Sequence, residues 1–135
     1  MMELYTQEKV GLMVRIHTGG MTWMQAAPQI PISLPLRVWS HVAFSWGQRG
    51  LHLYLNGRLI AKNEAPIRQN LGTREWLLGD SAVHQPRPGP PCVMDEVRIY
   101  DRVLTEAEIK ALYDLEKSGI QPATPRLPVF PKPRQ

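Results

Sequence analysis

The stretch that decides the fold is VWSHVAFSWGQRGLHLYLNGRLIA, residues 38–61. Apolar and polar side chains alternate before a turn at residues 47–50, and again after it from Leu51 to Leu55. Successive residues of a strand point to opposite faces, so both runs are typical of strands that are buried on one face. Asn56-Gly57 supplies the two positive φ angles of a type I′ turn. The sequence therefore predicts a hairpin in which the strand before Asn56 pairs directly with residues 58–61.

Further elements are predicted on both sides of this hairpin. Alternating side chains predict strands at residues 9–16 and 94–100. Further strands are predicted at residues 21–27, which Pro28 ends, and at residues 71–79, around the apolar run at 76–78. Thr105 followed by Glu108 forms a capping box, which predicts a short helix over residues 106–116 with Ile109, Leu112 and Tyr113 facing inward. The pattern as a whole is typical of an all-β protein with one short C-terminal helix.

Prolines bound the predicted domain on its C-terminal side. Five of them follow Ile120, at positions 122, 125, 128, 131 and 133, and they exclude regular structure. A chain of 135 residues has room for one core. The sequence thus predicts one domain over residues 1–119 and a disordered, proline-rich tail over residues 120–135.

Composition excludes several classes of function. The net charge is +4, but acidic and basic residues are interleaved except in the tail, so no footprint for nucleic acid is expected. The single cysteine, Cys92, rules out an intrachain disulfide and a cysteine-based metal cluster. No apolar run is long enough for membrane insertion, and the amino terminus is not expected to be a signal peptide.

Two segments and their spacing resemble a known family. WSHVA at residues 39–43 leads into LYLNGRL at 53–59, and MDEVRIYDRVLT at 94–105 follows, with LGD at 78–80 between them. These segments resemble the laminin G-like jelly-roll domains of the concanavalin A-like lectin/glucanase superfamily, over about residues 10–119. The resemblance implies an antiparallel β-sandwich whose first strands would precede Met1. A sheet edge left without those strands would favour self-association.

The resemblance also implies a function. Many such domains are noncatalytic modules of larger extracellular or cell-envelope proteins, and carbohydrate is the expected ligand. The alternative is a protein-interaction or scaffold domain that binds no sugar. Catalysis is not expected, because glycoside hydrolysis needs two carboxylates facing one cleft. The hydrolase pattern E-x-D-x-x-E is absent, and Asp95 and Glu96 are adjacent, so on a strand they would point to opposite faces.

Sugar recognition needs an exposed aromatic face with polar groups beside it. Trp46 and Trp76 are candidate platforms, and the long loop at residues 80–91 is the candidate rim, with Asp80, His84 and Arg87 as its binding residues. Trp23 is a further candidate, and for each of these three tryptophans core packing is the favoured alternative. Trp39 alternates with His41 and Ala43 in the best-matched segment and is expected in the core instead.

Asp95 is the candidate metal ligand. It matches a position at which relatives of this fold hold a structural calcium ion, and no other cofactor is expected. Calcium takes six to eight oxygen ligands, so other groups would have to supply most of them. The alternative is that Asp95 accepts hydrogen bonds from the backbone of its own loop.

Overall fold

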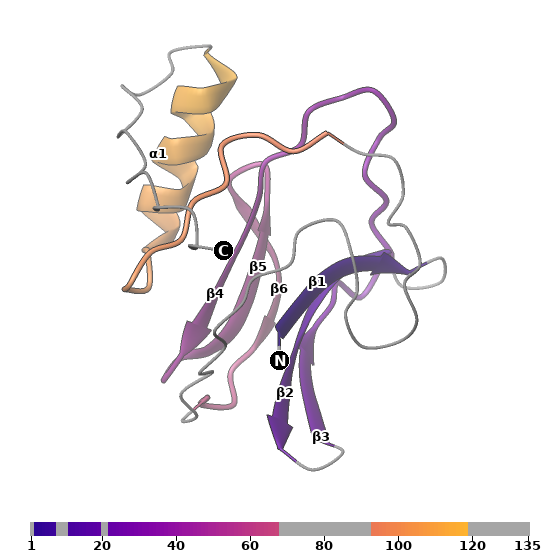
Figure 1. The fold of residues 1–135 in the computed structure, drawn as a ribbon, viewed down its shortest axis with the longest axis vertical. Helices are drawn as coiled ribbons and strands as arrows, with labels where there is room; N and C mark the ends of the chain where they lie inside the picture. Colours follow the sequence, from indigo (N-terminus) through magenta and orange to yellow (C-terminus); the bar gives the residue numbers. More distant parts are fainter. Residues whose placement is uncertain (1, 8–10, 20–21, 68–92, 119–135) are drawn as a thin grey trace, which may run out of the picture.

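The computed structural model describes residues 2–7, 11–19, 22–67 and 93–118 (Figure 1). One antiparallel sheet contains β1 (Met2–Gln7), β2 (Gly11–Gly19) and β3 (Thr22–Ala26), in that order. The other contains β4 (Val42–Gly47), β5 (Gly50–Leu55) and β6 (Arg58–Asn63), again in order. A single helix among the described residues, α1 (Glu106–Lys117), follows. The predicted fold class, an all-β antiparallel sandwich with one short helix, is confirmed.

The predicted hairpin forms β5 and β6. Asn56 and Gly57 have φ angles of 50° and 73°, as a type I′ turn requires, and Leu55 pairs with Arg58 across them. Gly57 is also pressed against the helix, because a Cβ atom there would lie 3.1 Å from Cδ1 of Tyr113. Glycine at this position therefore serves both the turn and the approach of α1.

The first sheet confirms two predicted strands and adds one. β2 and β3 correspond to the strands expected at residues 9–16 and 21–27, with Ile16 opposite Met24. β1 was not predicted, although it pairs with β2 along its whole length and sets Leu4 opposite Val14. Its six residues alternate too weakly to indicate a strand without the partner beside it.

The core lies between the two sheets. Leu12, Val14 and Ile16 of β2 and Leu51 and Leu53 of β5 face inward at every second position, as a strand with one buried face requires. The fully or nearly buried side chains of this cluster are Leu12, Val14, Ile16, Ala26, Leu51, Leu53, Ala61 and Ile67. Phe44 and Trp46 of β4 pack partly against it. The two faces thus bury one shared apolar layer, the usual driving force for sandwich formation.

The helix confirms the predicted capping box. The Thr105 hydroxyl accepts a hydrogen bond from the Glu108 backbone N–H at 3.2 Å, and Glu108 Oε2 accepts one from the Thr105 N–H at 2.8 Å. Ile109 is buried, and α1 lies against β6. No helix within the described part of the chain is long and apolar enough to span a membrane.

The strand predicted at residues 94–100 is wrong. Residues 93–105, here called the closing segment, contain no strand, and Val97 and Ile99 are exposed. Glu96 has a φ of 51°, in the left-handed region, and its backbone N–H donates to Asp95 Oδ1 at 2.8 Å. A residue in that conformation breaks the period-two alternation on which the prediction rested.

The core position expected for Trp39 is also wrong, since its side chain is 70% exposed. Arg37 has a φ of 59° and turns the chain, so the ladder of β4 begins only at Val42. The strand expected at residues 71–79, the loop at 80–91 and the tail at 120–135 lie outside the described residues.

Candidate functional site

The structure places two of the six candidate site residues. Trp46 lies in β4, half-buried, with its ring centroid 5.8 Å from that of Phe44. Asp95 is exposed in the closing segment, and no group of three or more possible metal-ligating side chains is found among the described residues. Trp76, Asp80, His84 and Arg87 lie outside those residues. Sugar binding at these positions and calcium binding at Asp95 therefore stay predictions.

A hollow of about 530 Å³ lies between the β5–β6 turn and α1, two segments far apart in the sequence. We call it the turn–helix hollow. Its lining residues are Leu55, Asn56, Gly57, Arg58, Ile60, Lys110, Tyr113, Asp114 and Lys117. The volume falls within the range of about 300–1,000 Å³ that is usual for small-molecule sites.

The lining combines an aromatic ring with polar groups that donate and accept hydrogen bonds. Tyr113 is half-buried, while Asn56, Arg58 and Asp114 are exposed around it. Asp114 accepts a hydrogen bond from Lys110, and the Lys117 ammonium lies 5.7 Å from the Tyr113 ring centroid. An exposed cation–π contact contributes only about 0.5–1 kcal/mol, so a ligand that stacks on the ring can displace it.

Backbone contacts hold the turn side of this hollow in place. Asn56 N–H donates to the His41 carbonyl at 2.8 Å, and His41 N–H donates to Asn56 Oδ1 at 3.0 Å. The His41 ring centroid lies 5.9 Å from that of Tyr113. His41, directly before β4, thus contacts both the turn and the aromatic ring of the site.

A group of charged and polar side chains holds the helix in place beside the hollow. Arg98 of the closing segment donates to Glu96 at 2.7 Å and to Glu116 of α1. Glu116 Oε2 in turn lies 3.8 Å from His41 Nε2. We call these four residues the Arg98 clasp. It joins the closing segment, α1 and His41, the residue before β4, so the position of Tyr113 depends on it.

Burial lowers the pKa of His41. The nearby Glu116 carboxylate raises this pKa and the Arg98 guanidinium lowers it, but burial is the largest effect. Within the described structure, His41 Nδ1 and Ser40 Oγ are buried and have no hydrogen-bond partner. The folded protein therefore favours the neutral imidazole.

This shift predicts a pH dependence of stability. An unfolded histidine titrates near 6.5, and the folded His41 titrates lower. At a pH between these two pKa values, the unfolded chain binds a proton that the folded chain does not bind. The contribution of neutral His41 to the free energy of unfolding is therefore complete above pH 6.5 and is lost as the pH falls toward the folded pKa. We expect the urea midpoint to decrease from pH 7.5 to pH 5.5, and His41→Gln to reduce that decrease.

His52→Gln, on β5, is the control for replacing a histidine that lies outside the Arg98 clasp. Glu108 does not interfere, because hydrogen bonds from Arg102 and Thr105 lower its pKa to about 2. Its contribution is present above its ordinary pKa of 4.5 and is lost only as the pH falls toward 2. An unchanged pH profile in the His41 variant would contradict the assignment.

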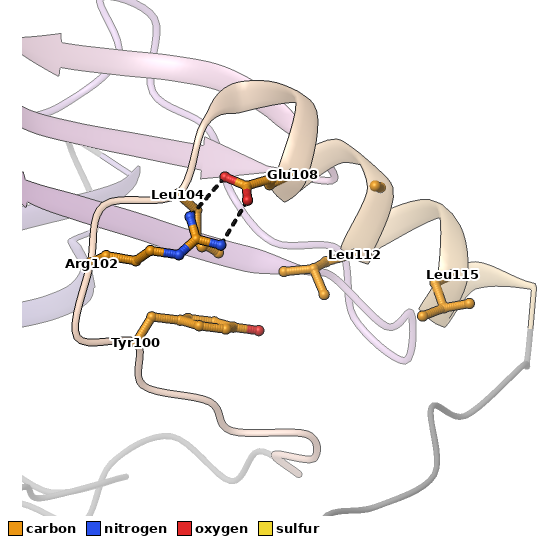
Figure 2. Close-up of a pocket in the computed structure, with 7 residues that line it drawn as sticks. Tyr100, Arg102, Leu104, Glu108, Leu112 and Leu115 are labelled. Atoms are coloured by element: carbon orange, nitrogen blue, oxygen red, sulfur yellow. Dashed lines mark hydrogen bonds and ion pairs between the residues drawn. The ribbon is translucent and has the colours of Figure 1, made fainter.

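A second hollow, of about 270 Å³, lies between the closing segment and α1 (Figure 2). We call it the Tyr100 groove. Its lining residues are Tyr100, Arg102, Leu104, Glu108, Ala111, Leu112 and Leu115. Arg102 spans its rim with two hydrogen bonds to Glu108, of 3.0 and 2.7 Å (Figure 2). The remaining lining is largely apolar and suits an apolar ligand.

Sequence reasoning did not identify either hollow. Asn56 was interpreted only as a turn residue and Tyr113 only as an inward-facing helix residue. The capping box and the Asn-Gly turn did locate the two elements that form the turn–helix hollow. Nothing in their spacing indicates that they meet, because the contact arises from tertiary packing.

Comparisons with known proteins agree with this architecture. The model of the Laminin_G_3 family, described as concanavalin A-like lectin/glucanases superfamily, matches residues 1–110. A crystal structure of residues 221–444 of an S-layer domain-containing protein from Clostridium thermocellum is similar, with a TM-score of 0.53 and 24% identity. The alignment covers 76% of this chain and 51% of the S-layer chain, so this chain spans about half the length of that structure. A comparison with curated proteins gave no match.

The family match extends over both sheets and into the start of α1. It contains the hairpin and the closing segment on which the resemblance was based. The chain therefore belongs to the Laminin_G_3 family of the concanavalin A-like lectin/glucanases superfamily.

Proposed function

We propose that this chain is a noncatalytic recognition module that binds carbohydrate in the turn–helix hollow, as part of an extracellular or cell-surface protein. One observation carries the proposal. The half-buried Tyr113 ring lies in a hollow that also presents the Asn56 amide and the Asp114 carboxylate. An aromatic face supports the apolar side of a sugar ring, while amide and carboxylate groups bind its hydroxyls. Membership of a lectin-containing superfamily supports both the ligand class and the location.

The chemistry of the lining supports a binding role rather than hydrolysis. Asp114 is the sole carboxylate among the lining residues, and Lys110 engages it. Glycoside hydrolysis requires a second carboxyl group, about 5–9.5 Å away across the substrate. The hollow thus offers contacts for a sugar but no acid–base pair.

The size of the hollow sets the expected affinity. It accommodates one or two sugar rings, of about 12–23 non-hydrogen atoms. At about 0.3 kcal/mol per atom, binding is worth about 4–7 kcal/mol, which corresponds to dissociation constants from about 1 mM to about 10 μM. A glycan array followed by calorimetry at high protein concentration is therefore the appropriate screen.

Tyr113→Ala should weaken binding of the best array ligand by at least about tenfold, equivalent to about 1.4 kcal/mol, because the stacking face is lost. Tyr113→Phe keeps the ring and should bind like the parent chain. Tyr100→Ala removes a tyrosine from the other hollow and is the matched control. Binding that survives Tyr113→Ala, or a folded chain that binds no glycan, would overturn the proposal.

The same assay tests the residues predicted from sequence. Trp76→Ala and Arg87→Ala examine the loop rim, and Trp46→Ala examines β4. Repeating the titration with calcium and with a chelator tests Asp95, whose carboxylate hydrogen-bonds the Glu96 backbone. Calcium-dependent binding that Asp95→Asn removes would support the metal ligand.

A protein-interaction role is the second candidate, and a specific observation favours it. Several large apolar side chains outside the core are at least half exposed, namely Ile30, Leu36, Val38, Trp39, Val93, Met94, Val97, Ile99 and Val103. Among the described strands, β4 pairs on one side only, with β5. Unpaired strand edges and exposed apolar side chains each favour strand addition or self-association. Light scattering across a concentration series separates this role from binding of sugar by a monomer.

A further inference from the structure

The Tyr100 groove is an apolar site that the proposed function does not use. Tyr100 and Leu104 form its wall on the closing segment, and Leu112 and Leu115 form its wall on α1 (Figure 2). Tyr100 is 41% exposed, and Ala111 on the helix is exposed as well. An aromatic ring beside aliphatic side chains is the kind of groove that recognises proline-rich segments in a polyproline II conformation.

The sequence of this chain contains such a segment. Residues 119–135 lie outside the described residues, but prolines recur at positions 122, 125, 128 and 131, every third residue. A polyproline II helix has three residues per turn, so in that conformation this period would place the prolines along one edge. Leu127 and Phe130 would then share a second edge and form a short apolar ridge.

We propose that residues 125–131, PRLPVFP, dock in the Tyr100 groove of their own chain, with Leu127 and Phe130 against Tyr100 and the leucines of α1.

The dimensions match. Leu127 and Phe130 are separated by three residues, or about 9 Å at the polyproline II rise of about 3.1 Å per residue. Leu115 lies seven positions after Glu108 on the helix wall, or about 10 Å at about 1.5 Å per residue. Nine residues from Ser118 to Leu127 span up to about 30 Å. This is ample for a return along α1 that begins at its C-terminal end.

Charge favours the same antiparallel direction. The segment after Lys117 contains Arg126, Lys132 and Arg134 and no acidic residue. A tail that returns along α1 brings its last two cations toward the first turn of the helix, where Glu106 lies; Glu108 of the same turn is already paired with Arg102. Opposite charges at that end add a modest, salt-sensitive attraction.

Covalent attachment makes a weak site sufficient. A short flexible connection gives an effective concentration in the millimolar range, so an intrinsic dissociation constant of about 1 mM yields substantial occupancy. That constant corresponds to about 4 kcal/mol. Complete burial of a leucine or phenylalanine side chain contributes about 1.5–3 kcal/mol, so burial of both contributes about 3–6 kcal/mol, a range that includes this value.

Hydrogen exchange of the full chain, read by mass spectrometry, tests the proposal. Leu127→Ser with Phe130→Ser should raise the exchange rate of amides in residues 100–115 by at least about threefold. Ala123→Ser with Val129→Ser alters the third edge of the tail and should leave the rate unchanged. Ala111→Arg places a bulky cation in the groove from an exposed, helix-compatible position, and it should raise the rate as the tail substitution does. Ala107→Arg, on the same helix but outside the groove lining, is its matched control.

Two results would overturn the proposal. One is equal exchange in the parent chain, the Leu127/Phe130 variant and the Ala111 variant. The other is protection that grows with protein concentration, because the occupant would then be a second copy rather than the chain's own tail. Neither result bears on glycan binding, which is measured in the other hollow.

Discussion

Leu53→Ala is expected to lower the free energy of unfolding by about 3 kcal/mol, within the range of about 2–5 kcal/mol for buried leucines. Leu53 lies in the middle of β5, its side chain is 0% exposed, and it packs in the cluster shared by both sheets. Truncation removes apolar contacts and leaves a cavity that the surrounding strands fill only in part. Small domains are stable by only about 5–15 kcal/mol, so a large part of the total is lost. Urea unfolding measures the change.

Leu36→Ala is the matched control, because the same chemical change is made at a side chain that is 91% exposed. Its effect should stay within about 0.5 kcal/mol. The denaturant slope should be unchanged in both variants, so that a shift in midpoint reports stability alone. Similar losses at the two positions would show that the face of β5 assigned to the core is wrong.

The parts of the fold that could be predicted are those fixed by local interactions. The β5–β6 hairpin follows from Asn56-Gly57, whose backbone angles depend on two neighbouring residues. The start of α1 follows from Thr105 and Glu108, which bond each other within one turn. In both cases the residues from which the element was predicted also form the turn or the hydrogen bonds that define it.

The wrong predictions concern residues whose structure depends on distant partners. An alternating run such as residues 94–100 becomes a strand only if another strand pairs with it, and Glu96 adopts a left-handed conformation instead. Trp39 was assigned to the core from its alternation with His41, but Arg37 turns the chain before the ladder begins. Alternation indicates which residues share a face, not whether that face is covered.

The turn–helix hollow could not be predicted for the same reason. Its aromatic residue and its amide come from segments separated by more than fifty residues, and they meet because Gly57 admits Tyr113 at close range. The tryptophans and loop residues selected from sequence were chosen by chemical type alone. Side-chain chemistry indicates what a residue can bind, whereas the sheet and the helix decide which residues share a site.

Arg98→Leu is expected to lower the free energy of unfolding by about 2 kcal/mol and to loosen α1 from the sheet. Arg98 is the cation between Glu96 and Glu116, and the side chains of Arg98 and Glu116 are only 25% and 23% exposed. Removing one member of a fully buried pair costs about 3–5 kcal/mol, because the remaining charge has no partner, and partial exposure reduces that cost. Exchange of α1 amides should rise with the loss of stability.

Glu116→Gln in the Arg98→Leu background should recover part of the loss, since it removes the carboxylate that was left without its cation. Arg102→Leu is the exposed counterpart: the side chains of Arg102 and Glu108 are 59% and 40% exposed, so the cost should be clearly smaller than that of Arg98→Leu. Because Tyr113 lies on α1, Arg98→Leu should also weaken glycan binding, while Arg102→Leu should not. Equal costs for the two arginines, without recovery by Glu116→Gln, would mean that packing of Ile109 and Tyr113 holds the helix without help from the clasp.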